Sequence, residues 1–288
     1  MQSAQRIIWL ASYPKSGNTW TRGFLANYFA PKSEQLDINS LRRFTTGDVR
    51  QDFFDRAAGR PFHAADFDEW LLTRPKALRL IALSKPHHHF VKTHSRIERI
   101  GDIDLIPPEV TAAAIYIIRN PFDVAQSYAR HLVSSLDAAI DRMMDARAVN
   151  YGPTMICEVL GSWETHVQSW LSAPGLPRHV MRYEDMVADP ERAFRGLLGF
   201  LRAPVNDGQL RRAIRAASFE QLRKQEEKAG FVERPPGMER FFAKGKAGSW
   251  REDLSPAQVA RLREAFLPTL ETWYPELLEE TATFAAGA

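Results

Sequence analysis

The chain has 288 residues, a size that allows one large domain or two small ones. Hydrophobic residues make up 44% of it and charged residues 25%, as is typical of a globular protein that buries a sizeable core. The formal net charge of +3 comes without a basic run, which argues against a nucleic-acid partner but allows a local positive pocket for an anionic ligand.

A single cysteine, Cys157, narrows the chemistry further. One cysteine excludes an intrachain disulfide and a cysteine-based zinc site, and it is typical of a reducing compartment. We expect Cys157 to be a small core residue rather than a catalytic one. The apolar run Ile7–Ala11 is too short for a signal peptide, and no run reaches the roughly 18 apolar residues of a membrane span. The sequence therefore predicts a cytoplasmic protein.

Short apolar runs with β-branched residues predict strands that are buried on both faces, as in a parallel sheet. These runs are Ile7–Ala11, Ala112–Ile118 and Val180–Tyr183, with a weaker one at Phe90–Thr93. Helical patterns separate them at Thr19–Phe29, Phe122–Leu132, Glu158–Leu171 and Pro190–Leu201. Because strands and helices alternate over the whole length, we predict one α/β domain, residues 1–288, with a central, mainly parallel sheet flanked by helices.

The stretch SYPKSGNTW, residues 12–20, lies between the first predicted strand and the first predicted helix. A helix N-terminus presents unpaired backbone N–H groups and the positive end of the helix dipole. Gly17 lets the backbone approach an anion and Lys15 adds a charge, while the side chains that can donate are Ser16, Asn18 and Thr19. The order differs from a nucleoside-triphosphate loop, because Lys15 precedes Gly17 and Ser12 stands in place of the first glycine.

Residues 228–248 (KAGFVERPPGMERFFAKGKAG) interrupt the alternation with glycines and prolines. We predict a mobile loop here, because long loops in compact domains are usually functional or disordered. Regular structure resumes at Ser255, which suits an N-cap; Pro256 suits the first helical position and Gln258 a capping box. A helix from Pro256 to about Leu267 should follow.

The segment YPKSGNTW resembles the loop that binds the 5′-phosphosulfate in sulfotransferases that depend on 3′-phosphoadenosine 5′-phosphosulfate (PAPS). Four further segments are similar to motifs of that family, in the family's order and over most of the chain. They are FVKTH (Phe90–His94), RNPFDVAQSY (Arg119–Tyr128), RYEDM (Arg182–Met186) and AKGKAGSW (Ala243–Trp250). The chain thus resembles the cytosolic type of this family, which implies a P-loop-like sulfotransferase fold.

The resemblance implies transfer of the sulfuryl group of PAPS to a hydroxyl acceptor, without a metal because lysines supply the positive charge. His94 would deprotonate the acceptor, Lys15 would stabilise charge on the leaving phosphate oxygen, and Lys92 would act near the sulfonate. Lys92 and His94 are two residues apart on a predicted strand, so they should point to the same face. His94 should lie at the carboxyl end of that strand, where open α/β sheets bind ligands.

Further residues are implied to hold the nucleotide. Arg119 and Ser127, which lies about two turns into the next helix, would grip the 3′-phosphate; a structural pair of Arg119 with Asp123 is the alternative. The other implied contacts beyond the loop are Trp20, Tyr183, Ser218, Phe219, Lys244 and Gly245. The family has an arginine where this chain has Ala243, so whether Arg240 or Lys246 replaces it stays open.

The three adjacent histidines, residues 87–89, suggest a metal site as an alternative. Consecutive side chains of an extended segment point to opposite faces and converge poorly on one ion, so we expect a loop and no metal. We also expect Trp163 and Trp170 to be core residues of the predicted helix Glu158–Leu171.

The acceptor site would be lined, by analogy, by residues 40–90 and 131–155. Their aromatic residues either form an apolar acceptor pocket or belong to the core: Phe44, Phe53, Phe54, Phe62, Phe67, Trp70 and Phe90. We expect a small acceptor such as a phenol, an alcohol or a secondary metabolite, with a carbohydrate or lipid as the alternative.

Two other functions stay open at this point. An ATP-dependent small-molecule kinase would need a correctly ordered phosphate loop and a magnesium-binding acid, and neither is evident. A non-catalytic nucleotide-binding or interaction protein would tolerate the loss of His94, and the presence of both His94 and Lys15 argues against it. The dimerisation motif of many cytosolic members is not visible in REDLSPAQVARLREAF, so the oligomeric state is open, a homodimer included.

Overall fold

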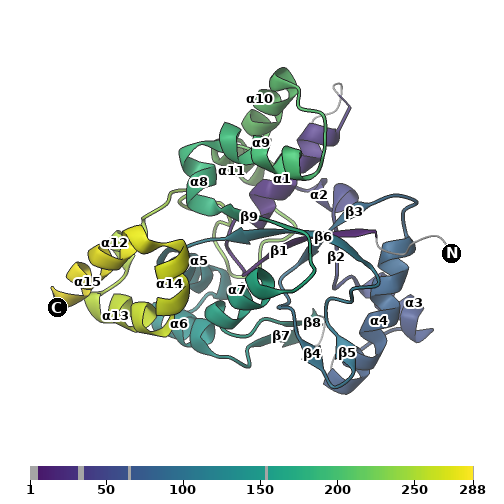
Figure 1. Ribbon diagram of the computed structural model, residues 1–288, viewed down its shortest axis with the longest axis horizontal. Helices are drawn as coiled ribbons and strands as arrows, with labels where there is room; N and C mark the ends of the chain where they lie inside the picture. Colours follow the sequence, from purple (N-terminus) through teal and green to yellow (C-terminus); the bar gives the residue numbers. More distant parts are fainter. Residues whose placement is uncertain (1–5, 32–35, 64–65, 153–154, 288) are drawn as a thin grey trace. The chain divides into compact units, whose positions relative to one another are not determined.

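The computed structural model describes residues 6–31, 36–63, 66–152 and 155–287. Its central element is a five-stranded sheet in the order β2-β3-β1-β6-β9 (Figure 1). The strands are β1 (Ile7–Ser12), β2 (Thr46–Gly47), β3 (His89–Thr93), β6 (Thr111–Ile118) and β9 (Arg178–Arg182). β3 pairs in parallel with both β1 and β2. The predicted α/β fold with a central parallel sheet is confirmed.

Two short antiparallel pairs and the helices complete the structure. The pairs are β4 (Arg99–Ile100) with β5 (Ile103–Asp104) and β7 (Val149–Gly152) with β8 (Met155–Val159). The helices are α1 (Asn18–Phe29), α2 (Leu41–Phe44), α3 (Gln51–Ala58), α4 (Phe67–Leu83), α5 (Pro121–Leu132), α6 (Leu136–Met144), α7 (Trp163–Ser172), α8 (Tyr183–Ala188), α9 (Pro190–Phe200), α10 (Asp207–Ala216), α11 (Phe219–Ala229), α12 (Trp250–Asp253), α13 (Pro256–Ala265), α14 (Leu267–Trp273), the 3-10 helix η1 (Pro275–Leu277) and α15 (Leu278–Ala286).

The chain divides into two compact units. The first comprises Met1–Tyr13, Arg42–Tyr116 and Asp145–Val180. The second comprises Pro14–Leu41, Ile117–Met144 and Met181–Ala288. The first unit thus contains β3 and α7, and the second contains α1 and α5.

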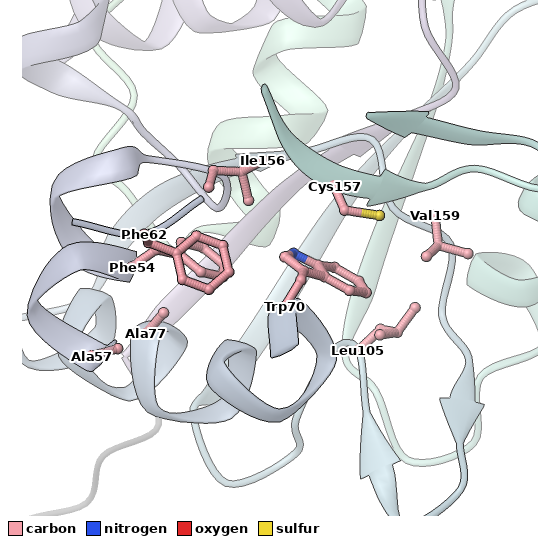
Figure 2. Close-up of a cluster of buried hydrophobic side chains, with 9 residues drawn as sticks. All are labelled: Phe54, Ala57, Phe62, Trp70, Ala77, Leu105, Ile156, Cys157 and Val159. Carbon is pink, nitrogen blue, oxygen red and sulfur yellow. The ribbon is translucent and has the colours of Figure 1, made fainter. Parts of the chain in front are cut away.

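An apolar cluster of the first unit includes residues of α3 and α4 (Figure 2). Its buried members are Phe54, Ala57, Phe62, Trp70, Ala77, Leu105, Ile156, Cys157 and Val159. Burial raises the pKa of the Cys157 thiol to about 12, so the thiol stays protonated and behaves as a small apolar side chain. The prediction that Cys157 is a core residue is confirmed. The same prediction for Trp163 and Trp170 is also confirmed, because both are fully buried.

The predicted loop before the C-terminal helices runs without helix or strand over residues 230–249. It begins two residues later than predicted, because α11 continues to Ala229. Phe231 and Phe242 of the loop are buried in a cluster with Ile38 and Leu222 of the same unit. Apolar anchors therefore hold the loop at two points, and its mobility stays a prediction.

Four predicted element assignments are wrong. Glu158 belongs to strand β8, and α7 begins only at Trp163, because Gly161 at φ 65° and the N-cap Ser162 separate the two elements. Tyr183 starts α8 instead of ending β9. His89 is a residue of β3 rather than of a loop, and its Nε2 lies 3.1 Å from the carbonyl oxygen of Ile81. The last predicted helix ends at Ala265, since Phe266 at φ −124° leaves the helical region.

Candidate active site

The loop between β1 and α1 has the geometry of an anion cradle. Gly17 is the N-cap of α1 at φ 105°, and no side chain caps this end, so the first N–H groups of α1 lack an intrahelical partner. A Cβ at Gly17 would lie 2.8 Å from Cδ2 of Tyr183, so the position requires glycine. The Ser16 hydroxyl is buried and has no hydrogen-bond partner among the described residues. The N-terminus of α1 and a buried hydroxyl together fit an anionic ligand.

Lys15 lies in the same loop, and its backbone has a conformation that favours glycine over other residues. Its φ of 69° is left-handed, a conformation that costs a lysine on the order of 1 kcal/mol or more. The surroundings hold it there, because Arg119 donates from Nη1 to the Lys15 carbonyl oxygen at 3.1 Å. The Lys15 ammonium lies 3.5 Å from the centre of the Phe241 ring. Strain of this kind, held by neighbouring residues, is typical of functional sites.

Arg119 connects the cradle with the loop before α12. Its Nη2 donates to the carbonyl oxygen of Lys246 at 3.2 Å, and its guanidinium lies 4.2 Å from the centre of the Tyr183 ring. The alternative partner Asp123 is also present, at 3.9 Å. Arg119 Nε is buried without a hydrogen-bond partner in the described part of the chain. The arginine is thus positioned mainly by backbone carbonyls, and one of its buried donors has no partner among the described residues.

Asp123 has a larger role than the sequence indicated. Its carboxylate accepts hydrogen bonds from the backbone N–H groups of Gly248 at 2.7 Å and Trp250 at 3.0 Å. The Ser249 hydroxyl donates to it at 3.3 Å. The fully buried Asp123 therefore anchors the loop before α12 to the first turn of α5. These partners lie 125 to 127 residues away, so no short-range pattern could have identified them.

The remaining predicted nucleotide residues divide into two groups. Trp20 packs edge-to-face on Tyr183 with ring centroids 5.8 Å apart, so it joins the group formed by Lys15, Gly17, Arg119 and Tyr183. Asn18 and Thr19 are in the first turn of α1. Ser127 lies in the middle of α5, about two turns in as predicted.

A second group surrounds Phe219. Gly245 packs so closely on the Phe219 ring that a Cβ there would lie 2.3 Å from it. Ser218 caps α11, with its hydroxyl accepting from the Gln221 N–H at 3.4 Å. Lys244 instead forms ion pairs with two acids, Glu252 at 3.0 Å and Asp253 at 2.9 Å.

A cavity of about 840 Å³ lies in the second unit between α5, α6 and the loop before α12. Ala243 lines it together with Gln126, Arg130 and Arg240. Arg240 lies 3.6 Å from Glu227, and Arg130 lies 3.7 Å from Asp253. Both arginines therefore line the same cavity as Ala243.

His94 follows the last residue of β3 in the first unit. Its Nδ1 lies 2.7 Å from the backbone carbonyl oxygen of Ser12. A carbonyl oxygen can only accept, so Nδ1 of the neutral imidazole carries the proton and Nε2 carries the lone pair. This contact between residues 82 positions apart assigns His94 to the tautomer that is protonated at Nδ1 and basic at Nε2.

Lys92 precedes His94 on the partly exposed face of β3, where Phe90 and Lys92 alternate with buried neighbours. The sequence missed Glu158, a carboxylate on β8 that is only 7% exposed. Burial raises the pKa of Glu158, and the positive charge of Lys92 opposes this shift. The sequence predicted a helix at Glu158, and only the pairing of β8 with β7 places this residue on a strand.

The structure does not gather the three histidines into a metal site. His89 is buried, whereas His87 and His88 are exposed. Within the described ranges, no group of three or more histidine, cysteine, aspartate or glutamate side chains could hold a metal ion.

Most aromatic residues of the predicted acceptor site are buried. Phe53, Phe54, Phe62 and Trp70 are core residues, which favours the second of the two alternatives for them. Phe44 and Phe90 are half-buried with ring centroids 5.6 Å apart, and Phe67 is 40% exposed. Residues 64–65 and 153–154 of the predicted lining segments lie outside the described residues.

Comparison with known proteins identifies the family. A family model described as "Sulfotransferase domain" matches residues 5–274. The chain belongs to this sulfotransferase family. Dog sulfotransferase 1B1 is 28% identical over 272 residues, which cover 87% of this chain and 79% of the dog protein. Cytosolic sulfotransferase 15 of Arabidopsis thaliana is 27% identical over 286 residues, covering 91% and 71%.

Solved sulfotransferase structures share the fold of this chain. The mouse sulfotransferase SULT7A1, solved in complex with adenosine 3′,5′-bisphosphate (PAP), has a TM-score of 0.63 at 21% identity, covering 96% of this chain and 89% of the mouse chain. Retinol dehydratase, solved with androsterone and PAP, has a TM-score of 0.64 at 22% identity, covering 92% and 81%. In the part of this sulfotransferase that the structure describes, no helix is long and apolar enough to cross a membrane.

Proposed function

We propose that this sulfotransferase transfers the sulfuryl group of PAPS to a hydroxyl group of a small molecule. The observation that carries the proposal is the cradle at the N-terminus of α1, with the strained Lys15 and the buried Ser16 hydroxyl. Relatives solved with PAP add support by family analogy.

The residues of the cradle fit the 5′ end of such a nucleotide. The N-terminal N–H groups of α1, the Ser16 hydroxyl and the Lys15 ammonium would bind the phosphosulfate, with Asn18 and Thr19 as further donors. Arg119 Nε, a buried donor without a partner among the described residues, and Ser127 would hold the 3′-phosphate. Trp20 would stack near the adenine, and Tyr183, Ser218 and Phe219 would supply further adenosine and 3′-phosphate contacts. Gly245 would belong to the loop that closes over the nucleotide.

His94 and Lys15 have separate tasks in the proposed reaction. PAPS would supply the activated sulfuryl group. His94 accepts the proton of the acceptor hydroxyl at Nε2, the nitrogen that the contact with Ser12 leaves basic. Lys15 offsets the negative charge on the leaving phosphate oxygen, and Lys92 offsets charge on the sulfonate. In this proposal the charges of the two lysines and the positions of the reacting groups take the place of a metal ion.

The missing arginine at Ala243 needs a substitute in this proposal. Lys246 is close to Arg119, because the Lys246 carbonyl oxygen accepts a hydrogen bond from Arg119. Arg240 lines the same cavity as Ala243 but lies 3.6 Å from Glu227. Lys244, the other predicted contact in this loop, would have to leave its two acidic partners to reach a phosphate.

The acceptor is proposed to be a phenol, an alcohol or a secondary metabolite, with a carbohydrate or lipid as the alternative. Retinol dehydratase, solved with androsterone or with retinol, is a neighbour that binds such small apolar molecules. A cytoplasmic location completes the proposal and is supported by the single cysteine and by the cytosolic relative of Arabidopsis.

The nucleotide is tested by thermal unfolding with and without PAP, using ATP with magnesium as the control. A ligand at about a hundred times its dissociation constant adds roughly 2.7 kcal/mol of stability. We expect PAP alone to raise the melting temperature. A rise with ATP alone would support a kinase instead, and no rise with either nucleotide would contradict the proposed donor site.

The base is tested by replacing His94 with alanine. We expect the variant to bind PAP like the wild type but to transfer sulfate from PAPS at least about a hundredfold more slowly, the scale of general base catalysis. Wild-type turnover in this variant would refute the role of His94 and leave the donor site standing.

A further inference from the structure

The segment that carries His94 is held by side chains of a single helix, α7. His166 Nε2 lies 3.1 Å from the backbone carbonyl oxygen of His94. Trp170 Nε1 donates to the carbonyl oxygen of Ser95 at 3.1 Å. The Ile97 N–H donates to the Ser169 hydroxyl at 3.0 Å. Residues 166, 169 and 170 are spaced so that they lie on one face of α7. This face contacts the backbone of residues 94, 95 and 97, which follow β3.

His166 continues this contact into the core through Tyr116 of β6. Its Nδ1 lies 2.9 Å from the Tyr116 hydroxyl, and both side chains are fully buried. Because the His94 carbonyl can only accept, Nε2 of His166 carries the proton and Nδ1 must accept. The Tyr116 hydroxyl therefore donates to it. The chain of donors runs in one direction, from Tyr116 through His166 to the carbonyl of His94.

Burial keeps each member of this chain in the required protonation state. It lowers the pKa of His166 to about 3, so the imidazole is neutral at physiological pH and has one donor and one acceptor nitrogen. Burial also raises the pKa of the Tyr116 phenol, which keeps its proton. Ring contacts fix the imidazole in place, with Tyr13 edge-on at 5.4 Å and Tyr116 at 5.8 Å between centroids.

We propose that Tyr116 and His166 are positioning residues for His94. The Tyr116 hydroxyl selects the His166 tautomer that holds the His94 carbonyl, and this contact fixes the backbone from which the His94 imidazole reaches the Ser12 carbonyl. The proposal rests on the proposed role of His94 as general base. It gives the buried polar pair a purpose that packing alone does not require, since two apolar side chains would fill the same space without a tautomer to control.

The first measurement reads the His94 tautomer without any acceptor. A proton–nitrogen correlation spectrum of the full chain, labelled in histidine, distinguishes an imidazole protonated at Nδ1 from one protonated at Nε2. The variants His94→Ala and His166→Gln assign the signals. We expect a single Nδ1–H form of His94 in the wild type and a mixture of forms in Tyr116→Phe and His166→Leu.

Two variants separate positioning from plain stability. Glutamine in His166→Gln can donate to the His94 carbonyl and accept from Tyr116, so we expect it to restore the single form. Tyr28→Phe is the matched control, because it removes the hydroxyl of a second buried tyrosine, which donates to the backbone carbonyl of Pro204 at 2.6 Å and not to His166. It should leave the His94 signals unchanged.

The kinetic readout is sulfate transfer from PAPS to 2-naphthol. We expect Tyr116→Phe and His166→Leu to lower kcat at least about tenfold, because a displaced catalytic group loses rate steeply, while the dissociation constant of PAP stays within about twofold. An unchanged His94 tautomer in both variants would overturn the proposal, and so would a loss that His166→Gln fails to rescue. Wild-type turnover in His94→Ala would refute the base itself, whereas the tautomer measurement would still decide the positioning.

Discussion

Lys15 combines features that an ordinary surface lysine lacks. Its backbone is left-handed at φ 69°, its carbonyl accepts from Arg119, and its ammonium lies 3.5 Å from the centre of the Phe241 ring. A lysine held in this way is pre-organised, so its charge is available without further ordering of the loop. The residue therefore belongs to the small set whose removal should affect turnover more than folding.

The variant Lys15→Met tests this separation. Methionine keeps the length and the contact with Phe241 but removes the charge that would face the leaving phosphate. We expect kcat to fall by about 10² to 10³, as for other electrostatic groups at a reacting centre, with a melting temperature close to that of the wild type. Lys224→Met, at an exposed lysine on α11 paired with Glu220, is the matched control and should keep full activity. A kcat within a few-fold of the wild type would show that Lys15 carries no such charge stabilisation.

Gly245 is a second residue whose identity is set by its neighbours. Its φ is 64°, and a Cβ there would lie 2.3 Å from the Phe219 ring. Gly245→Ala should destabilise the protein by about 1 to 2 kcal/mol from the backbone alone, and it should also push the loop away from Phe219 and weaken PAP binding. Thermal unfolding and calorimetric titration with PAP measure the two effects.

Gly175→Ala is the matched control for Gly245. Gly175 has φ 67° but nothing within 4 Å of a built Cβ, so it reports the backbone cost alone. We expect this variant to lose stability and to keep its PAP affinity. Equal PAP affinity in the two variants would contradict a role of Gly245 and Phe219 in nucleotide binding.

At the scale of elements, a buried ion pair ties α4 to the end of β2 and to β3. Arg74 Nη2 lies 2.7 Å from Asp48 Oδ2, with side chains 0% and 1% exposed. The same oxygen accepts from the Thr93 hydroxyl at 2.8 Å, and Arg74 Nε donates to the Leu105 carbonyl at 3.0 Å. The pair thus holds the strand that leads to His94.

Breaking this pair should be costly. We expect Arg74→Met to lower the free energy of unfolding by about 3 to 5 kcal/mol, because it leaves the Asp48 carboxylate buried without its counter-charge. The exposed pair Arg50–Asp52, at 2.6 Å with 48% and 51% exposure, is the control, and Arg50→Met should cost less than about 1 kcal/mol. Urea denaturation compares the two. A similar cost at both sites would mean that burial does not distinguish the pairs.

Local contacts were predictable from the sequence, and distant ones were not. The capping box of α13 needs only Ser255 and Gln258, whose two hydrogen bonds of 3.0 and 3.3 Å were expected from their spacing. The cradle at Gly17 was predictable for the same reason, because it needs only a strand, a turn and a helix start. The contacts of Asp123 with Gly248 and of Tyr116 with His166 join residues that are far apart in the sequence and meet only in the folded chain.

Glu158 shows why a helical pattern can fail. Its apolar neighbours have helical spacing, yet β8 pairs with β7 and the carboxylate is buried. Tertiary pairing overrode a weak local preference, as it often does for short segments. The strand position of Glu158 depends on this pairing and was therefore not assigned from the sequence.

At the scale of the whole molecule, buried neutral histidines make the fold sensitive to acid. Burial lowers the pKa of His166 to about 3, with a smaller lowering by the charge of Arg96, against the raising effect of the contact with the His94 carbonyl. Burial also lowers the pKa of His89 and His179. Above pH 6.5, the ordinary histidine value, His166 is neutral in the folded and unfolded chains, so its titration does not change the stability. Below it, only the unfolded chain binds the proton, so the folded state loses stability as the pH falls toward the folded value.

The variant His166→Gln isolates this contribution, because glutamine can keep both hydrogen bonds and cannot titrate. Urea denaturation of both proteins between pH 7 and pH 4 should show the wild type losing about 1.4 kcal/mol per pH unit more than the variant below about pH 6.5. The two curves should run parallel above that pH, since neither state of His166 then takes up a proton. His89 and His179 titrate equally in both proteins and cancel in the difference. Parallel curves over the whole range would mean that His166 takes up its proton at the same pH in the folded and unfolded chains, and would contradict the burial of a neutral imidazole that accepts the Tyr116 hydrogen bond.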